Sequence, residues 1–416
     1  MSAHVLFVGG EDHDLRIPFM TALAQQGYRI TTAASAAPEP FDRACLEYIR
    51  FGFNRFWDPA SDFRTWRTLG RILKDVDADI VHSYDTKLSI LVPYASYFNP
   101  RTIVVRTING RAWTFSSRSV GASALRVLYR PIQRLAAAAT SATVFEHRED
   151  QAFFERNWLI GKSESVKIPG AGIDIRGFED SQRAGPTAET LRAEFGLEGS
   201  NVVITVGRVT REKGILDLLK AAALVHQVRP SVKFLIVGPR HSEGPFAVSD
   251  AELALHSEYV ITTGPRSDVP SLLAMSDVFA FPSAYAEGLP RALMEAALSG
   301  IPIVTTDQPG CMEVVRDGRN GYVTPRGNPS ALAEGILALL NDRVAAARMA
   351  ALGPVIIKNE FSLERVLDQH VELYEHLLAR RRIPGEHEID LARRDRRPFE
   401  TLPSSRPQLA ETRDVN

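Results

Sequence analysis

Two carboxylates, Glu287 and Glu295, stand eight residues apart on either side of Gly288, Leu289 and Pro290. The apolar run before them predicts a strand. The residues between the two carboxylates predict a turn and then a helix with Pro290 at its first position, where a missing N–H costs nothing. Free N–H groups and the positive end of the helix dipole make such a helix start a natural diphosphate site. Because Glu295 lies roughly 7 Å deeper along the helix, the two carboxylates can bind hydroxyls on both sides of a diphosphate, as a nucleotide sugar presents them.

A second predicted loop between a strand and a helix carries two cations. Residues 202–206 form an apolar run that ends at Gly207, and Arg208 and Lys213 precede the amphipathic segment 215–225. Ligands of open α/β sheets bind at the carboxyl ends of the strands, and fixed cations there suit a leaving diphosphate. A pair of solvated loop charges is the alternative if this loop is considered alone.

The composition is that of an ordinary globular protein and fits two or three domains. The chain has 416 residues, a net charge of −1, 44% hydrophobic and 24% charged residues, which gives no bulk attraction to nucleic acid. No apolar run approaches the roughly 18 residues of a membrane span, and residues 1–8 predict a first strand rather than a signal peptide. The two isolated cysteines, Cys45 and Cys311, predict a reducing compartment and no metal site. We therefore expect a cytoplasmic protein.

Apolar runs that predict strands alternate with helical patterns along the chain, which predicts an α/β fold with parallel sheets. We expect a first half over residues 1–180 and a second half over 181–360, joined by a polar hinge at 178–199 that contains Gly and Pro. A helical pattern follows at 361–382. Residues 383–416 are rich in Arg, Asp, Glu, Pro and Ser and predict a disordered tail.

The motifs, taken in order, resemble those of family 4 retaining glycosyltransferases of the GT-B fold. The resemblance rests on Gly207-Arg208 with Lys213-Gly214, on Gly264 with Asp268-Val269, on Ser283, on the Glu287/Glu295 pair and on segment 305–315. It is strong over about residues 200–340 and looser over 1–180. It implies two Rossmann-like domains that face each other across a cleft, with a C-terminal helix that crosses back to the N-terminal domain.

The resemblance also implies an activity and assigns residues to it. The implied reaction is retaining, metal-independent transfer from a nucleotide sugar, without a cofactor. A UDP-sugar is the expected donor, and a GDP-sugar is the alternative. The expected acceptor is a lipid-linked glycan of cell-surface polysaccharide synthesis at the inner face of the membrane. The catalytic residues would be Arg208, Lys213 and Glu287. The nucleotide-sugar-binding residues would be Glu295, Gly288, Leu289, Pro290, Gly264, Arg266, Asp268, Val269 and Ser283. The residues that face the acceptor or the sugar would be Gly9, Gly10, His82, Lys87 and Asn109.

Asn109 is the main departure from the family pattern. Many relatives have His at that position, where it contacts the donor sugar. Asn can donate and accept hydrogen bonds but takes no proton, which puts a proton-shuttling role in doubt. We expect Asn109 to position the sugar.

A basic segment without Asp or Glu covers residues 101–140. Arg126, Arg130 and Arg134 recur every four residues, so a continuous helix would place them on one face beside apolar residues, although Pro131 can kink that helix. Basic residues beside an apolar helix suit an anionic membrane surface. They also suit an acceptor that carries a diphosphate. Pairing of these arginines with acidic side chains elsewhere in the fold is the alternative.

Two other functions remain open at this point. The first is a nucleotide-sugar epimerase of the same fold, which would convert a free nucleotide sugar without an acceptor. The second is a non-catalytic scaffold in a polysaccharide-assembly complex, which would tolerate Ala at Arg208, Lys213 and Glu295.

Overall fold

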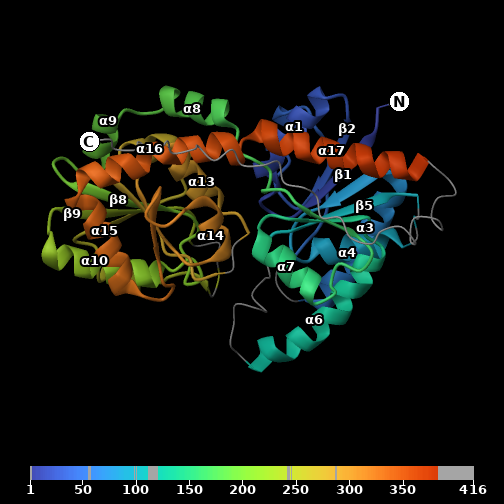
Figure 1. Ribbon diagram of the computed structural model, residues 1–416, viewed down its shortest axis with the longest axis horizontal. Helices are drawn as coiled ribbons and strands as arrows, with labels where there is room; N and C mark the ends of the chain where they lie inside the picture. Colours follow the sequence, from blue (N-terminus) through green and yellow to red (C-terminus); the bar gives the residue numbers. More distant parts are fainter. Residues whose placement is uncertain are drawn as a thin grey trace, which may run out of the picture.

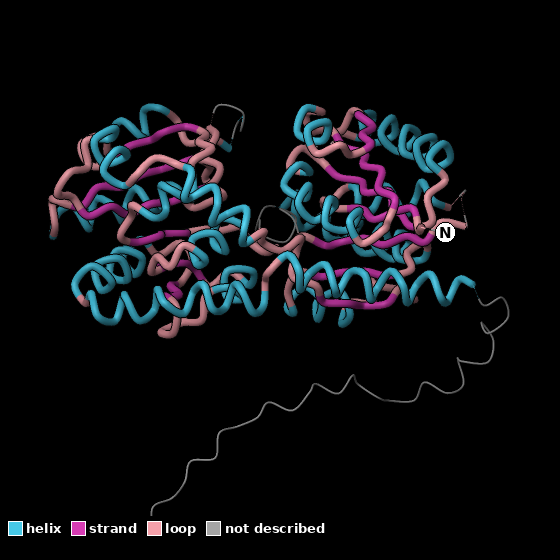
Figure 2. Tube along the Cα trace, turned by 90° about the horizontal axis from the view of Figure 1, so that it is seen from above, coloured by secondary structure: helices cyan, strands magenta, loops and turns pink. Residues whose placement is uncertain are grey.

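The computed structural model describes residues 2–54, 58–97, 99, 101–110, 120–240, 244, 246–285 and 288–382, with the backbone alone for 120–126, 128 and 382. Within this part of the chain, two α/β halves lie side by side in both views (Figures 1 and 2). Each half is built on its own parallel sheet with helices packed against it. The predicted architecture of two Rossmann-like domains is confirmed.

The N-terminal sheet has seven parallel strands within the described residues, in the order β3-β2-β1-β4-β5-β6-β7. The order reverses between β1 and β4, and such switch points are where open α/β sheets bind ligands. The strands are β1 (His4–Gly9), β2 (Arg29–Ala34), β3 (Glu47–Arg50), β4 (Ile80–Ser83), β5 (Ile103–Ile108), β6 (Ala142–Phe145) and β7 (Glu164–Lys167). The helices of this half are η1 (His13–Arg16), α1 (Ile17–Gln25), α2 (Glu39–Arg43), α3 (Pro59–Val76), α4 (Leu88–Ser96), α6 (Val120–Ala138) and α7 (Arg148–Arg156).

The C-terminal sheet repeats this plan with six described strands in the order β10-β9-β8-β11-β12-β13, so its switch point lies between β8 and β11. Its strands are β8 (Asn201–Val206), β9 (Val232–Val237), β10 (Val260–Gly264), β11 (Val278–Phe281), β12 (Ile303–Thr306) and β13 (Gly321–Thr324). The helices that follow β7 are α8 (Ile175–Ala184), α9 (Ala188–Phe195), α10 (Ile215–Val228), α11 (Asp250–Ala254), α12 (Val269–Ala274), α13 (Arg291–Leu298), α14 (Pro309–Val314), α15 (Pro329–Asn341), α16 (Arg343–Glu360) and α17 (Leu363–Arg382).

The first strand shows why apolar runs fold this way. β1 is buried along its whole length, because both faces of a parallel sheet are covered by helices. Val5 and Phe7 pack with residues of α1 and α17, whereas Leu6 and Val8 pack with residues of α3 and α4. This alternation follows the two-residue period of a strand, and each such side chain contributes about 1.5–3 kcal/mol by its burial.

The chain crosses between the halves twice, and the two crossing segments hydrogen-bond to each other. Ile173 N donates to Phe361 O at 2.9 Å, and Leu363 N donates to Ile173 O at 2.9 Å. Gly172 has φ +73°, and a Cβ there would lie 2.7 Å from the Cα of Leu363, so a side chain at this crossing would force a shift. α16 packs on α13 and α15, whereas α17 packs on α1 and the N-terminal sheet (Figure 1). The predicted helix that crosses back is confirmed.

The stretch predicted as a polar hinge is helical instead. α8 and α9 occupy most of residues 178–199 and pack on α12 of the C-terminal half. Each helix has one buried residue, Phe178 in α8 and Leu191 in α9. One apolar position per helix is too few to predict a helix from the hydrophobic pattern. The domain boundary placed at residue 180 therefore falls inside α8.

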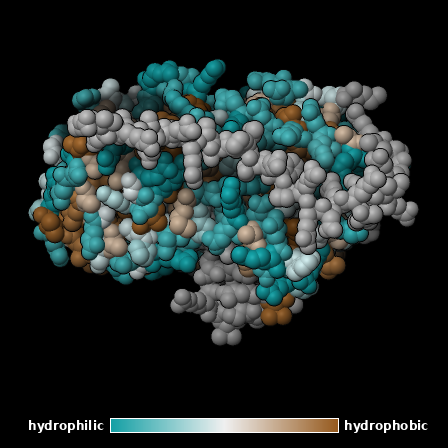
Figure 3. Space-filling model, viewed as in Figure 1, coloured by the Kyte–Doolittle hydropathy of each residue, from teal (hydrophilic) through white to brown (hydrophobic). Residues whose placement is uncertain are grey.

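The coloured residues on the face shown in Figure 3 are mostly hydrophilic, with separate hydrophobic patches toward the left and the lower right. None of the helices in the described residues is both long enough and apolar enough to cross a membrane.

Candidate active site

The switch points of both sheets carry predicted site residues. Gly9 ends β1 and Gly10 follows it, next to the end of β4. Arg208 comes two residues after β8, and Ser283 comes two residues after the neighbouring strand β11. The structure therefore places these residues at the carboxyl edges of their sheets, as the sequence predicts.

The loop that carries Lys213 is fastened to the loop after β11. Gly214 has φ +72°, and a Cβ there would lie 1.9 Å from the carbonyl oxygen of Pro282. Ala284 N donates to the carbonyl of Glu212 at 3.1 Å, and Lys213 Nζ lies 5.7 Å from the centroid of the Phe281 ring. The close approach requires glycine at position 214 and holds a cation at the edge of the sheet.

The helix after this loop starts one residue later than predicted. α13 begins at Arg291, and Pro290 is its N-cap in an extended conformation, with φ −69° and ψ 113°. The Pro290 carbonyl still accepts from Leu293 N and Met294 N. Pro290 therefore caps the first turn of α13, although its own backbone is not helical. Glu287 lies outside the described residues, and its catalytic role stays a prediction.

A carboxylate from the N-terminal half occupies this helix start. Glu146 directly follows β6 and is 6% exposed, and its Oε2 accepts the Leu289 N–H at 2.8 Å. Its Oε1 accepts from Asn109 Nδ2 at 2.8 Å. A Cβ on Gly288 would lie 2.1 Å from Glu146 Oε2. Burial raises the pKa of Glu146, whereas the nearby Arg16 cation and the Leu289 N–H act in the opposite direction.

Glu295 is held by an arginine that also reaches the other half. Its Oε1 accepts from Arg291 Nε at 2.8 Å. Arg291 Nη1 donates to the carbonyl of Leu15 in η1 at 3.1 Å. The Glu295 carboxylate, predicted to bind the nucleotide sugar, thus lies within α13 and next to a contact between the halves.

Four residues predicted to bind the nucleotide sugar, Gly264, Arg266, Asp268 and Val269, lie between the end of β10 and the start of α12. Gly264 ends β10 with φ +74°, and Arg266 donates to both oxygens of Asp268, at 2.8 and 2.6 Å. Arg266 Nη1 also donates to Glu194 Oε1 of α9 at 2.7 Å. Hydrogen bonds from Arg266 lower the pKa of Asp268. Val269, at the start of α12, packs against the core, so the structure brings all four predicted residues together.

Gly9 and Gly10, predicted to face the acceptor or the sugar, lie against the side chains of His13 and Asp85. A Cβ on Gly9 would lie 1.9 Å from His13 Nδ1, and one on Gly10 would lie 2.9 Å from Asp85 Oδ2. Lys87 stands at the start of α4, where Nζ donates to Asn54 O at 2.8 Å and pairs with Asp62. Lys87 is therefore near the carboxyl edge but is already neutralised by a carboxylate.

His82 lies in the core and not on a surface that an acceptor can reach. Its Nδ1 lies 2.6 Å from the Tyr374 hydroxyl of α17, and its Nε2 lies 2.7 Å from Thr107 Oγ1. Burial lowers the pKa of His82 well below its ordinary value. The prediction that His82 faces the acceptor is wrong, because the returning helix covers this position.

A further contact between the halves joins α14 to the end of β7 and the start of α7. Glu313 of α14 accepts from Lys167 Nζ at 2.7 Å and from Arg148 N at 3.2 Å. A cavity of about 370 Å³ opens here, lined from both halves by His147, Arg148, Glu149, Pro309, Met312, Glu313, Arg316 and Glu360. Among the described residues, no group of three or more His, Cys, Asp or Glu side chains could hold a metal ion.

Two arginines of α6, Arg130 and Arg134, donate hydrogen bonds to the turn that follows α7. Arg130 Nη2 donates to Asn157 Oδ1 at 2.9 Å. Arg134 donates to the carbonyls of Trp158 and Asn157 at 3.3 and 3.2 Å. These partners are an amide and two carbonyls, which are neutral. The alternative that these arginines pair with acidic side chains is therefore wrong for Arg130 and Arg134. The side chain of Arg126 lies outside the description.

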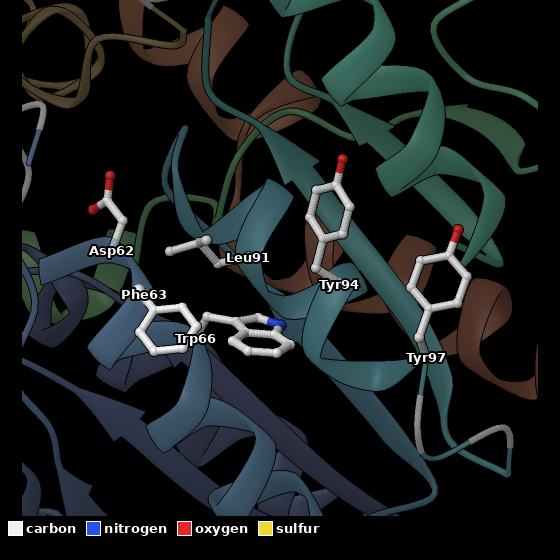
Figure 4. Close-up of a pocket in the computed structure, with 6 residues that line it drawn as sticks. All are labelled: Asp62, Phe63, Trp66, Leu91, Tyr94 and Tyr97. Atoms are coloured by element: carbon white, nitrogen blue, oxygen red, sulfur yellow. The ribbon is translucent and has the colours of Figure 1, made fainter. Parts of the chain in front are cut away.

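An aromatic groove runs between α3 and α4 on the N-terminal half (Figure 4). It has a volume of about 440 Å³ and is lined by Asp62, Phe63, Trp66, Leu91, Tyr94 and Tyr97. The Tyr94 and Tyr97 hydroxyls donate to the carbonyls of Ile132 and Leu135, which fastens the groove to α6. A neighbouring hollow of about 810 Å³ shares Phe63 and Trp66 and adds four basic residues, Arg67, Arg71, Lys74 and Arg101.

Three residues of the site escaped the sequence analysis: Glu146, Arg291 and Arg16. One feature of the sequence could have indicated Glu146 as a site residue: it is a charged residue directly after a buried strand, at the edge where ligands bind. Arg16 had no local signal. Its guanidinium lies 4.3 Å from the Tyr84 ring centroid, a position that depends on the fold of the whole sheet.

Two facing Rossmann-like halves and a returning C-terminal helix are the architecture of the GT-B fold. Residues 187–354 match the family model described as glycosyl transferases group 1, and residues 19–171 match the one described as glycosyltransferase family 4. The chain belongs to the family 4, group 1 glycosyltransferases. This membership decides against the epimerase alternative.

Several characterised relatives share this family. A UDP-Gal:α-D-GlcNAc-diphosphoundecaprenol α-1,3-galactosyltransferase of Escherichia coli is 25% identical over 316 residues, 75% of this chain and 79% of the relative. An N,N′-diacetylbacillosaminyl-diphospho-undecaprenol α-1,3-N-acetylgalactosaminyltransferase of Campylobacter jejuni is 24% identical over 337 residues, 80% and 86% of the two chains. The crystal structure of Anabaena HepE with UDP-glucose superposes with a TM-score of 0.71 at 20% identity, over 90% of this chain and 99% of the other, which shows the common fold.

Proposed function

We propose that this glycosyltransferase transfers a sugar from a UDP-sugar to a lipid-linked glycan, with retention of configuration and without a metal ion. The observation that carries the proposal is the meeting of the Arg208–Lys213 loop with the loop that leads into α13. The relatives from E. coli and C. jejuni, by their names, act on sugars linked to undecaprenol diphosphate. HepE was crystallised with UDP-glucose.

Charge stabilisation is the main chemical contribution that these residues would make. Arg208 and Lys213 would neutralise the leaving diphosphate, and fixed charges placed where negative charge develops contribute on the order of 100-fold or more in rate. Glu295 would hold the ribose hydroxyls, and Glu287 would hold hydroxyls of the sugar and stabilise an oxocarbenium-like state. The acceptor would attack from the face that the diphosphate leaves, and the departing phosphate would take its proton. No protein nucleophile is part of this scheme.

We further infer that the protein works at the inner face of the membrane, where a lipid-linked acceptor is held. The apolar side chains Val127 and Leu135 of α6 are 73% and 54% exposed, and the aromatic groove adjoins this helix. Exposed apolar and basic residues on one face are suited to an anionic lipid surface.

Nucleotide binding is the first test of this function. Thermal unfolding would be followed with UDP, GDP and ADP. A ligand at about 100 times its dissociation constant stabilises the fold by roughly 2.7 kcal/mol. We expect a shift with UDP that is lost in Glu295→Ala and kept in Glu334→Ala, an exposed carboxylate change on α15. If none of the three nucleotides shifts the unfolding temperature, or if both variants lose the shift equally, the proposal is contradicted.

The same residues give a test in cells against the scaffold alternative. Arg208→Ala, Lys213→Ala and Glu295→Ala should each abolish glycan extension while the protein stays folded and present at normal levels. Normal glycan length in these variants would favour a non-catalytic role.

A further inference from the structure

Glu146 is a buried carboxylate with no role in the scheme above. It comes from the N-terminal half, yet one of its oxygens accepts the Leu289 N–H in the turn before α13. The other accepts from Asn109 Nδ2. Both contacts measure 2.8 Å, so the carboxylate is fixed in position by a group from each half.

The fit around this carboxylate is tight on the side of the C-terminal half. A Cβ on Gly288 would lie 2.1 Å from Glu146 Oε2 and 3.1 Å from the backbone carbon of Asn109. The turn can approach only because residue 288 has no side chain. Gly288 directly follows Glu287 in the sequence. In the proposed scheme Glu287 binds the sugar and Glu295 binds the ribose, so this scheme assigns Glu146 to the sugar end of the donor.

The groups gathered here are rich in hydrogen-bond acceptors. A carboxylate has about four lone-pair sites and uses only some of them for two donors. Asn109 Oδ1 is buried and has no hydrogen-bond partner among the described residues. Such a set suits a ligand that brings O–H or N–H donors, and it disfavours a ligand that brings a second negative charge.

We propose that Glu146 joins Asn109, already expected to position the sugar, in recognising the transferred sugar, and that Glu146 selects an uncharged sugar over a uronate. The inference rests on the proposed use of a nucleotide sugar and adds the class of sugar to it. A hydroxyl or an acetamido N–H can donate to Glu146 or to Asn109 Oδ1. A sugar carboxylate would stand against Glu146 in a buried place, where like charges repel strongly.

The proposal predicts a specificity that is lost when one carboxylate is replaced by its neutral amide. Glu146→Gln keeps the shape of the side chain and removes its charge. We expect the wild-type protein to bind UDP-glucose at least roughly tenfold more tightly than UDP-glucuronate, and we expect Glu146→Gln to bring this ratio toward one. Binding of both donors and of free UDP would be measured by calorimetry at pH 7.5.

Glu313→Gln is the matched control, because Glu313 also links the halves but contacts Lys167 and Arg148 rather than α13. It should leave the ratio unchanged even if it weakens both donors. Thermal unfolding without ligand would show that each variant is folded.

The outcomes separate this inference from the proposed function. If free UDP does not bind to the wild-type protein, the proposed function and this inference fall together. If UDP binds but Glu146→Gln leaves the ratio of UDP-glucose to UDP-glucuronate unchanged, the inference alone is wrong. A wild-type preference for UDP-glucuronate would also overturn it.

Discussion

Gly288 shows how a single missing side chain governs the contact between the halves. An added Cβ would overlap Glu146 Oε2 at 2.1 Å and press on the Asn109 backbone at 3.1–3.2 Å. We predict that Gly288→Ala lowers the free energy of unfolding by about 1–3 kcal/mol, as overpacking does. The double variant Gly288→Ala/Glu146→Ala should recover part of this loss, because the carboxylate is then gone.

Urea unfolding would measure both variants beside Gly70→Ala. Gly70 lies inside α3, and a methyl group added to it would have nothing within 4 Å, so alanine there should stabilise the helix by roughly 0.5–1 kcal/mol. A stable Gly288→Ala variant would mean that the turn has room to move.

The residues of the C-terminal half could be predicted from the sequence because they stand in short local motifs. Arg208 and Lys213 share one loop, and Gly288, Leu289 and Glu295 share one turn and helix. Glu146 could not be predicted as a partner of Leu289, since the two are 143 residues apart. The burial of His82 could not be predicted for the same reason, because Tyr374, which covers it, lies 292 residues further on.

Among the elements, α17 covers the N-terminal sheet and buries two histidines. His82 contacts Tyr374, and His370 packs within α17 with Nδ1 on the Val366 carbonyl at 2.8 Å. Burial lowers the pKa of His370 to about 4 and that of His82 well below its ordinary value. Protonating either ring in the folded state would place a charge in the core.

This burial predicts the direction of the pH dependence. The unfolded chain takes up protons below about pH 6.5, whereas folded His370 does so only near pH 4. The free energy of unfolding should therefore be highest above pH 6.5 and fall as the pH decreases toward 4. His370 alone would account for roughly 3 kcal/mol. Urea unfolding at pH 7.5, 6.0 and 4.5 would measure this decrease.

A variant assigns the effect to the buried ring. His370→Leu should reduce the slope of unfolding free energy against pH, whereas His376→Gln on the half-exposed side of the same helix should change it little. An unchanged slope in His370→Leu would place the acid sensitivity elsewhere in the fold.

The elements themselves were predictable where their apolar patterns were strong. β1, β8 and β11 are buried runs, and α17 begins and ends close to the predicted limits. The edge strand β3 and the two helices α8 and α9 were missed. β3 has no fully buried residue, and each of the two helices buries a single side chain, so their positions depend on packing that a local pattern does not contain.

At the scale of the whole molecule, the exposed apolar and basic side chains gather on one side of the N-terminal half. Phe63 and Tyr97 are 57% and 48% exposed at the groove between α3 and α4, and Leu135 extends this surface onto α6. Arg67 and Arg71 are exposed on α3 at four-residue spacing. Arg130 and Arg134, by contrast, already hold the turn after α7. The cations that meet a membrane are therefore expected on α3 more than on α6.

We predict that the protein binds vesicles of phosphatidylcholine that contain phosphatidylglycerol, and that it binds vesicles of phosphatidylcholine alone much less. Each basic residue near an anionic surface contributes about 1 kcal/mol, so Arg67→Glu/Arg71→Glu should weaken binding by more than roughly tenfold in a flotation assay. Arg319→Glu/Arg348→Glu makes the same change of charge at exposed positions of the C-terminal half and should have little effect. Equal binding to both kinds of vesicle, or an equal loss in both double variants, would show that this side of α3 and α4 does not face the membrane.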